Sequence, residues 1–365
     1  MNVPYALRSG KNAKFPYFLR NSLSLLVPRR VFLGRLDAAL SSIQARADAA
    51  EIEARAAYCC RLDPRPASAG GPSAPLPDSA PRLREQRLPW KGQVYYFDTR
   101  EWLRWFPPDL RWMHFPGDVT FVPESPSVVK SRPIAEDLGP ESANAASVLL
   151  NLNKIRHFTF VRDSVPDGEK RPVAVFRGKV RGKPLREAFF AANFGGPGLD
   201  LGDTSSRPAR AEWGTGKLSI AEQLRYRYIL SLEGNDVASN LKWIMSSNSV
   251  ALAPRPRFET WFQEGLLLPG VHYAEIAPDG SDVAKVVARL EAHPEERARI
   301  VAAANAWVAR FRDKSRERLV SLRVLDRYFR ATTGWTGPWR DFPRPPAPRS
   351  DSASQDSGRR EAALA

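Results

Sequence analysis

The chain has 365 residues, enough for two ordinary domains, and 43% of them are hydrophobic, including 10 tryptophans. Its formal net charge of +15 suits an anionic partner such as a nucleic acid, a membrane face or a phosphorylated ligand, although arginine that only solvates the surface would give the same value. The two cysteines are the neighbours Cys59 and Cys60, which excludes a disulfide framework or a metal-ligand spacing and indicates a reducing compartment.

Residues 1–62 are predicted to form a basic segment followed by a helix. No acidic residue precedes Asp37, whereas six basic residues are interleaved with aromatic and aliphatic ones: Arg8, Lys11, Lys14, Arg20, Arg29 and Arg30. The apolar runs are far shorter than the roughly 20 residues that span a bilayer, and no small-residue cleavage site follows them. The segment is therefore predicted either to lie on an anionic membrane face or to pack on the fold.

The helix of this first part is expected at residues 31–62, because Leu36, Leu40, Ile43 and Ala47 recur at helical spacing. Residues 63–90 are rich in proline, alanine and serine and are predicted to be a linker. Residues 340–365 have a similar composition and are predicted to be a disordered tail.

Strand and helix signals alternate through the folded body, which predicts βαβ units and two parallel sheets. Strands are predicted at residues 93–98, 119–123, 127–131, 147–153, 173–178, 228–232, 249–253 and 272–276. Helices are predicted at residues 99–106, after a capping box of Ser219 and Glu222, at 237–246 with Asp236 as cap, at 281–293, and from Pro294 to Phe329.

Polar turns follow two of the buried strands. The strand at 228–232 ends in Glu233, Gly234, Asn235 and Asp236, and the helix expected from Val237 would offer free N–H groups to a phosphate. The strand at 173–178 leads into the basic, glycine-bearing loop "FRGKVRGKPLR", a composition that can hold phosphate. The alternatives are an ordinary capped turn and a solvated basic loop, and neither a Walker nor a dinucleotide fingerprint is present.

Several stretches together resemble glycosyltransferase family 90, with the bacterial lipopolysaccharide branch most similar. They are, in order, "GDVTFVPESPSVVKSRPI", "SVLLNLNKIRHFTFV", "VFRGKV", "YILSLEGNDVASNLKWIMSSNSVALAPRPRFETWFQEGLLLPGVHYAEI" and "SDVAKVVARLE", within roughly Lys91 to Phe329. The resemblance implies an α/β protein of GT-B architecture, with two Rossmann-like domains facing a central cleft and an N-terminal helical extension. It places the acceptor-side domain at residues 91–170, completed by helices near 310–332, and the nucleotide-sugar domain at 171–309.

The resemblance further implies an inverting transfer from a nucleotide sugar, usually UDP-linked, with no metal or other cofactor. The folded body agrees in lacking an Asp-x-Asp pair. Asp118 matches the family position of the general base, with Asp98 and Asp109 as weaker candidates; the alternative for Asp118 is a turn-ordering role.

The donor-binding residues expected from the two strand ends and from the family motifs are Arg177, Gly178, Lys179, Glu233, Gly234, Asn235, Asp236, Val237, Ser239, Lys242, Glu259, Trp261 and Glu264. Trp261 could equally be a core residue. The animal branch has an arginine near Asn240 that contacts the diphosphate, and its absence here shifts that role to Arg177 and Lys242.

The partners expected are therefore a nucleotide-sugar donor, a lipopolysaccharide core or other glycan acceptor, and an anionic membrane surface, with a cytoplasmic location at the inner face of the membrane. The sugar is of the glucose, galactose or xylose type. Two alternatives remain: a basic nucleic-acid-binding protein, for which no signature is visible, and a sugar-binding scaffold that has lost catalysis.

Overall fold

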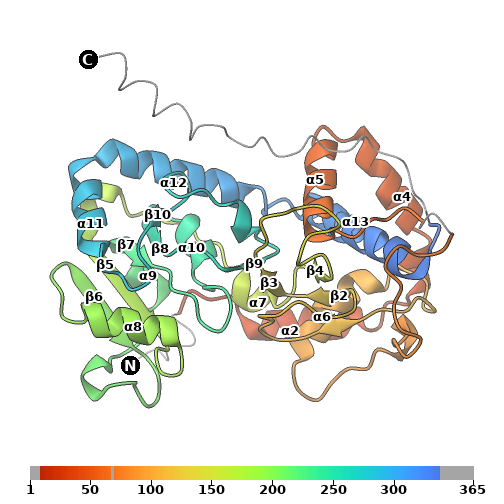
Figure 1. The fold of residues 1–365 in the computed structure, drawn as a ribbon, viewed down its shortest axis with the longest axis horizontal. Helices are drawn as coiled ribbons and strands as arrows, with labels where there is room; N and C mark the ends of the chain where they lie inside the picture. Colours follow the sequence, from red (N-terminus) through yellow and green to blue (C-terminus); the bar gives the residue numbers. More distant parts are fainter. Residues whose placement is uncertain (1–8, 67–69, 338–365) are drawn as a thin grey trace.

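The computed structural model describes residues 9–66 and 70–337 of the chain. Two parallel sheets lie side by side along the long axis, the five-stranded sheet on the left and the three-stranded sheet on the right of Figure 1. A two-stranded antiparallel pair joins them. The protein is therefore a mixed α/β structure, as predicted, with two parallel sheets.

The five-stranded sheet has the order β10-β8-β7-β5-β6, with all neighbours parallel. Its strands are β5 (Arg171–Gly178), β6 (Leu199–Asp203), β7 (Tyr226–Leu230), β8 (Val250–Ala253) and β10 (Ala274–Glu275). Its helices are α8 (Pro184–Asn193), α9 (Ile220–Gln223), α10 (Leu241–Met245), α11 (Val283–Ala292) and α12 (Pro294–Ala309). After β5 the chain adds β6 on one side and β7 on the other, so the strand order reverses between β5 and β7. In open α/β sheets, ligands bind at the carboxyl ends of strands at this position.

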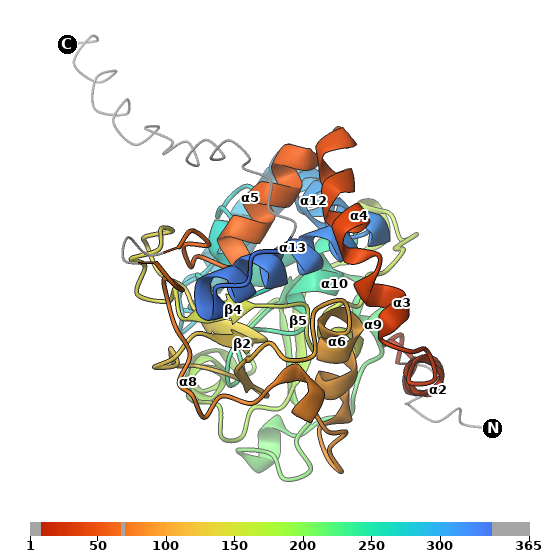
Figure 2. The ribbon, with the colours of Figure 1, turned by 90° about the vertical axis from the view of Figure 1, so that its right-hand side faces the viewer.

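The three-stranded sheet has the order β1-β2-β4 and is also parallel. Its strands are β1 (His114–Phe115), β2 (Ser127–Val129) and β4 (Ser147–Leu149). The helices near it are α5 (Ala49–Cys59), α6 (Gln93–Leu103) and α13 (Lys314–Thr333). Helix α13, the last in the described residues, lies beside α5 and α4 (Leu36–Ser41; Figure 2). The Tyr328 hydroxyl accepts from Met113 N (2.9 Å) and donates to Pro126 O (3.0 Å). Helix α13 thus packs on the first half of the chain.

The protein has two halves, one built around the three-stranded sheet and the other around the five-stranded sheet. The antiparallel pair of β3 (Ser131–Pro133) and β9 (Phe258–Thr260) connects these halves, and a buried charge lies at the connection. Arg132 on β3 is fully buried and donates to Glu259 Oε1 on β9 (2.8 Å) and to the Tyr58 carbonyl (2.8 Å). The Tyr58 hydroxyl donates to the other oxygen of Glu259. Because an unpaired buried charge is costly, these groups fix the two strands and α5 together.

Several predicted elements are confirmed. The strands expected around β5, β7, β8 and β10 are present, Ser219 and Glu222 form the predicted capping box, and Pro294 opens α12. The strand predicted at 93–98 is wrong: these residues belong to α6, where Phe97, Trp102 and Leu103 share the buried face. The strand predicted at 119–123 is also absent, because the Ser131 hydroxyl, rather than a neighbouring strand, bonds the backbone N–H and carbonyl of Val119.

Three predicted helices are shorter or broken. Residues 31–62 form α3 (Arg30–Leu33), α4 (Leu36–Ser41), a 3-10 turn η1 (Ser42–Ala45) and α5, interrupted at Gly34 and around Asp48, whose carboxylate binds Arg46 and Arg316. Residues 294–329 contain a break at 310–313, after which Asp313 caps α13. The helix predicted at 237–246 is only α10 (Leu241–Met245), because Asp236 pairs with Lys130 instead of capping it.

The remaining short elements are α7 (Lys154–His157), η2 (Leu83–Glu85), η3 (Asp167–Glu169), η4 (Ala211–Trp213) and η5 (Glu264–Leu266). In the segment predicted as a linker, Ala80 and Leu83 are buried and Leu83 N donates to Leu110 O, so this short stretch packs on the protein, whereas most of the other described residues of the segment are exposed. The predicted tail at 340–365 lies outside the described residues. Of the helices that the structure describes, none combines the length and apolarity needed to cross a membrane.

Helix α2 (Lys14–Ser24) lies at the edge of the molecule and rests on α6 (Figure 2). The Tyr17 hydroxyl donates to Asp98 Oδ1 (2.7 Å), and Lys154 N donates to Asp98 Oδ2 (3.1 Å). Asp98 is 1% exposed, and this burial raises its pKa to about 6, although Lys154 and the Tyr17 hydrogen bond act in the opposite direction. The Asp98 carboxyl thus holds α2 in place, and its burial leaves it inaccessible to an acceptor hydroxyl.

Asp98→Asn should remove one pH-dependent contribution to stability. The pKa of Asp98 lies above its ordinary value of 3.8, so the folded state binds the proton more tightly, and this stabilisation is lost as the pH rises through about 6. The free energy of unfolding of the wild type relative to the variant should therefore fall by about 1–3 kcal/mol between pH 4 and 7. Urea denaturation at stepped pH measures this, and a difference that rises with pH would contradict it.

Candidate functional site

The carboxyl ends of β5 and β7 border a cavity of about 360 Å³, here called the basic pocket. Its lining comprises Lys11, Asp118, Arg156, Phe176, Arg177, Gly178, Lys179, Lys183, Arg186, Thr204, Lys217, Leu218, Ile220, Gln223, Gly234, Asn235, Asp236, Val237, Ser239, Asn240 and Trp243. The two polar strand ends singled out in the sequence thus meet in one site, at the point where the strand order reverses.

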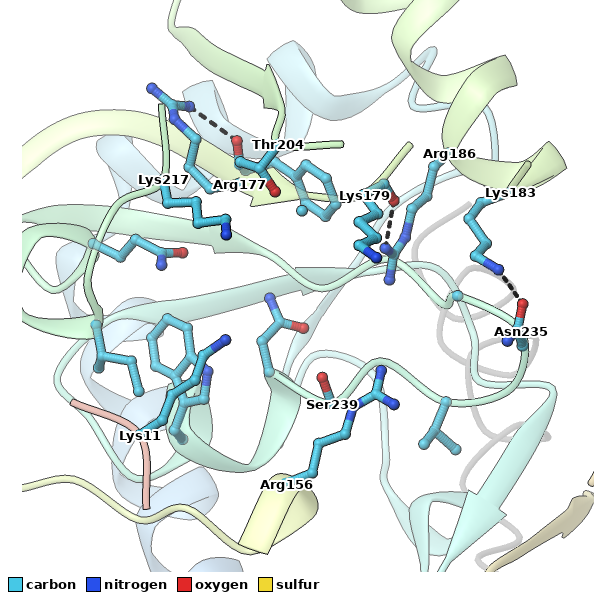
Figure 3. Close-up of a pocket in the computed structure, with 18 of the residues that line it drawn as sticks. Lys11, Arg156, Arg177, Lys179, Lys183, Arg186, Thr204, Lys217, Asn235 and Ser239 are labelled. Atoms are coloured by element: carbon cyan, nitrogen blue, oxygen red, sulfur yellow. Dashed lines mark hydrogen bonds between the residues drawn. The ribbon is translucent and has the colours of Figure 1, made fainter. Parts of the chain in front are cut away.

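Cations converge on the pocket from distant parts of the chain. Figure 3 shows Lys11 and Lys217 on one side and Lys179 and Arg186 on the other. Within the described residues, the side chains of Lys11, Arg156 and Lys179 form no hydrogen bond or ion pair. Burial, followed by the charges of Arg156, Lys217 and Lys14, lowers the pKa of Lys11. This concentration of positive charge favours a ligand with at least two negative charges.

Arg186 binds the two strand-end loops to each other. Its guanidinium donates to the carbonyls of Lys179 (2.7 Å), Leu232 (2.7 Å) and Glu233 (3.0 Å), which leaves it little capacity for a ligand. A Cβ on Gly234 would lie 3.3 Å from Arg186 Nη2, so glycine leaves room for this side chain. The need for glycine at position 234 is thus explained by the packing of Arg186, without invoking a ligand.

Arg177, predicted as a diphosphate ligand, is directed toward β6. Its Nη2 lies 2.5 Å from Asp200 Oδ1, and its Nη1 donates to the carbonyls of Phe176 (2.9 Å) and Asp200 (2.8 Å). Its charge is therefore compensated by the protein, although the residue borders the pocket. Lys179, two residues later, borders the pocket and forms no ion pair with the described residues, so its charge is available to a ligand.

Asp118 lies at the edge of the pocket, in the loop between β1 and β2, and is held from both halves of the protein. Lys130 Nζ lies 2.5 Å from Asp118 Oδ1 and 2.6 Å from Asp236 Oδ2, and it is 1% exposed. Asn235 Nδ2 donates to Asp118 Oδ2 (2.9 Å). One buried ammonium group thus bridges a carboxylate from each half.

The charge of Asp118 is stabilised by this bridge. Burial alone raises the pKa of Asp118, but the hydrogen bond and the charge of Lys130, with smaller effects of Asn235 and Arg156, lower it below 3.8 overall. Asp118 is therefore ionised at neutral pH. Each of its oxygens retains a second lone pair that can accept a proton or a hydrogen bond.

Five of the predicted donor-binding residues lie outside the basic pocket. Glu233 accepts hydrogen bonds from the backbone and side chain of Arg257 and borders a different hollow. The fully buried Lys242 pairs with Glu264. Glu259 is held by Arg132 and Tyr58, and Trp261 is buried and donates from Nε1 to Glu317 Oε2 (2.5 Å).

Lys11, Arg156 and Lys217 were missed by sequence reasoning. They belong to three separate segments, before α2, in α7 and before α9, and no local motif links them. Asn240, where the animal branch has arginine, uses its amide to bond the Leu230 carbonyl (2.9 Å), and its carbonyl accepts from the Ser231 hydroxyl (3.2 Å). Lys242, predicted to take over the role of that arginine, is buried against Glu264 and does not border the pocket. The described residues contain no cluster of three or more His, Cys, Asp or Glu side chains able to hold a metal.

Comparison with known proteins identifies the class to which this site belongs. The family model "Glycosyl transferase family 90" matches residues 155–322, which include both strand-end loops. The chain is also 40% identical over 254 residues to the O-glucosyltransferase LpsA of Dichelobacter nodosus, an alignment that covers 70% of this chain and 77% of that protein. The protein therefore belongs to glycosyltransferase family 90 and is a transferase that acts on sugars.

Glu259→Gln tests whether the buried carboxylate is structural. Removing one partner of a buried pair leaves Arg132 uncompensated, so the free energy of unfolding should fall by about 3–5 kcal/mol. The affinity of the folded fraction for UDP should stay within about twofold, because Glu259 does not border the pocket. Urea denaturation and calorimetric UDP titration measure the two quantities. Unchanged stability with lost UDP affinity would instead make Glu259 a donor ligand.

Proposed function

We propose that this enzyme is an inverting, metal-independent glycosyltransferase of GT-B architecture, in which Asp118 is the general base. It moves a sugar from a UDP-sugar to a hydroxyl group of a lipopolysaccharide or related glycan acceptor. The name of the relative from D. nodosus favours glucose among the glucose, galactose and xylose alternatives. The observation that carries the proposal is an ionised carboxylate at the edge of a cation-lined pocket, where the order of a parallel sheet reverses.

The pocket cations suit the diphosphate of the donor. The side chains of Lys11, Arg156 and Lys179 form no hydrogen bond or ion pair with the described residues, and a diphosphate would supply negative charge for all three. Charge that builds up on the leaving UDP would be neutralised by these fixed cations, which is the role that a metal has in other transferases. Helix α10 contributes little to this, because it has only five residues and begins after Asn240.

Asp118 is suited to accept the proton of the acceptor hydroxyl. As the acceptor oxygen attacks the anomeric carbon from one side, the bond from that carbon to UDP breaks on the other, which inverts its configuration. The proton passes to Asp118, whose ionised state at neutral pH is set by Lys130. Lys130 positions the base; it does not itself need to contact either substrate.

The alternatives are less well supported. Membership of a glycosyltransferase family argues against a nucleic-acid-binding protein, despite the charge of +15. Asp118 and the unpaired pocket cations argue against a scaffold without chemistry. A cytoplasmic location is proposed because nucleotide sugars are made there and because Cys59 and Cys60 are unbridged.

Asp118→Asn is expected to abolish most of the transfer without affecting the donor site. The substitution is nearly isosteric, and the loss of a general base typically lowers kcat by 10²–10⁴-fold. UDP affinity should stay the same or rise slightly, because Asp118 carries the same sign of charge as the diphosphate and does not bind it. Release of UDP from UDP-glucose in the presence of acceptor measures the rate, and near-normal turnover would assign the base to another residue.

Lys179→Met should weaken UDP binding itself, by about tenfold or more, because a charged hydrogen bond contributes about 1.5–3 kcal/mol. Lys285→Met on α11 is a matched control, since this exposed lysine lies outside the pocket. Calorimetric titration with UDP, in the presence and absence of EDTA, gives both comparisons. Equal weakening in the control, or loss of wild-type binding in EDTA, would contradict the metal-independent charge site.

A further inference from the structure

Helix α2 presents two different faces. Its inner face rests on the protein through the Tyr17–Asp98 hydrogen bond and through edge-to-face contact of the Phe18 and Phe97 rings, 6.1 Å between centroids. Its carboxyl end is tied by Arg104, which donates to the Ser24 carbonyl (3.4 Å). The helix is thus fixed in orientation, and its outer face has a defined direction.

The outer face is a row of exposed apolar side chains. Phe15, Leu19 and Leu23 are spaced by four residues, which places them on one side of the helix, and Leu26 follows just after it. Their exposed fractions are 76%, 48%, 57% and 79%. On a helical wheel this row lies opposite the packed face formed by Tyr17, Phe18, Asn21 and Ser24. Contiguous exposed apolar surface of this kind marks an interaction site.

The charge around this row identifies its partner. Exposed cations flank it, namely Lys14, Arg20 and Arg30, and the first acidic residue of the chain is Asp37. An apolar face bordered by cations is the pattern of a helix that lies in the interface plane of an anionic membrane, where each cation contributes about 1 kcal/mol. A second copy of this chain would have to bring the same positive charge against itself, which disfavours a dimer.

We propose that α2 docks the protein on an anionic lipid bilayer, with Phe15, Leu19, Leu23 and Leu26 inserted at the boundary between headgroups and acyl chains. Because its inner face is fixed to α6, the helix would hold the whole protein in a defined orientation on the bilayer. The sequence pattern alone left membrane contact and packing as alternatives; the structure supports both at once, on opposite faces of one helix.

The docking helix adjoins the basic pocket. Lys11 lines the pocket, and α2 begins three residues later at Lys14, so their Cα atoms are separated by at most about 11 Å. Docking would therefore hold the pocket close to the bilayer surface. On the proposed function, this favours an acceptor hydroxyl carried on a lipid anchor over a freely diffusing one.

The test uses the full chain and vesicles of phosphatidylglycerol and phosphatidylcholine, compared with phosphatidylcholine alone. The wild type should co-sediment with the anionic vesicles, and Leu19→Ser/Leu23→Ser should lower the partition coefficient at least tenfold. Leu268→Ser/Val271→Ser is the matched control, since these residues are similarly exposed, at 48% and 43%, but distant in sequence from α2. It should bind like the wild type.

Three results would overturn the proposal: no binding by the wild type, equal binding by the α2 variant, or equal binding to neutral vesicles. A dimer in sedimentation velocity that only the α2 variant loses would assign the face to a second copy instead. UDP affinity, measured on the same preparations, should be unchanged in all variants. It reports on the basic pocket, so failure of docking and failure of the proposed function are distinguished.

Discussion

The structure depends on one buried ammonium group. Lys130 is almost without solvent contact and lies between Asp118 and Asp236, so its charge is tolerated only because two carboxylates compensate it. Asp118 precedes β2, and Asp236 follows β7, so the same ion pairs join the two halves of the protein and set the ionisation of the candidate base. A movement of the two halves that separated Lys130 from Asp236 would alter both the basic pocket and the surroundings of Asp118.

The basic pocket follows a different principle. The buried cations of the described protein are mostly paired, as Arg132 is with Glu259 and Lys242 with Glu264. Lys11, Arg156 and Lys179 are solvent-exposed instead, and they line the pocket without an ion pair among the described residues. Like charges held together by a fold raise its free energy, and a polyanionic ligand relieves this repulsion. On the proposed function, the diphosphate of the donor would be that ligand, and its binding would stabilise the folded state.

The N-terminal segment connects the pocket with the surroundings of the protein. Ser9 accepts a backbone hydrogen bond from Ile220 at the start of α9, Lys11 borders the pocket, and Tyr17 anchors α2 through the buried Asp98. A segment of only some fifteen residues therefore contacts both halves. Among the described residues its outer apolar row stays exposed, and this is the face that we propose to contact a lipid surface.

The sequence by itself determined the strands that build the site. The apolar runs ending at Gly178 and before Glu233 identify β5 and β7 because buried parallel strands are continuously hydrophobic, and the family motif identified Asp118. Only the tertiary structure decided which charges are paired inside the protein and which line the pocket. Arg177, Lys242 and Glu259 have partners brought from other segments, and Lys11, Arg156 and Lys217 converge from three separate ones. Whether a charge is paired depends on its neighbours in space, and the order of residues along the chain does not show which residues these neighbours are.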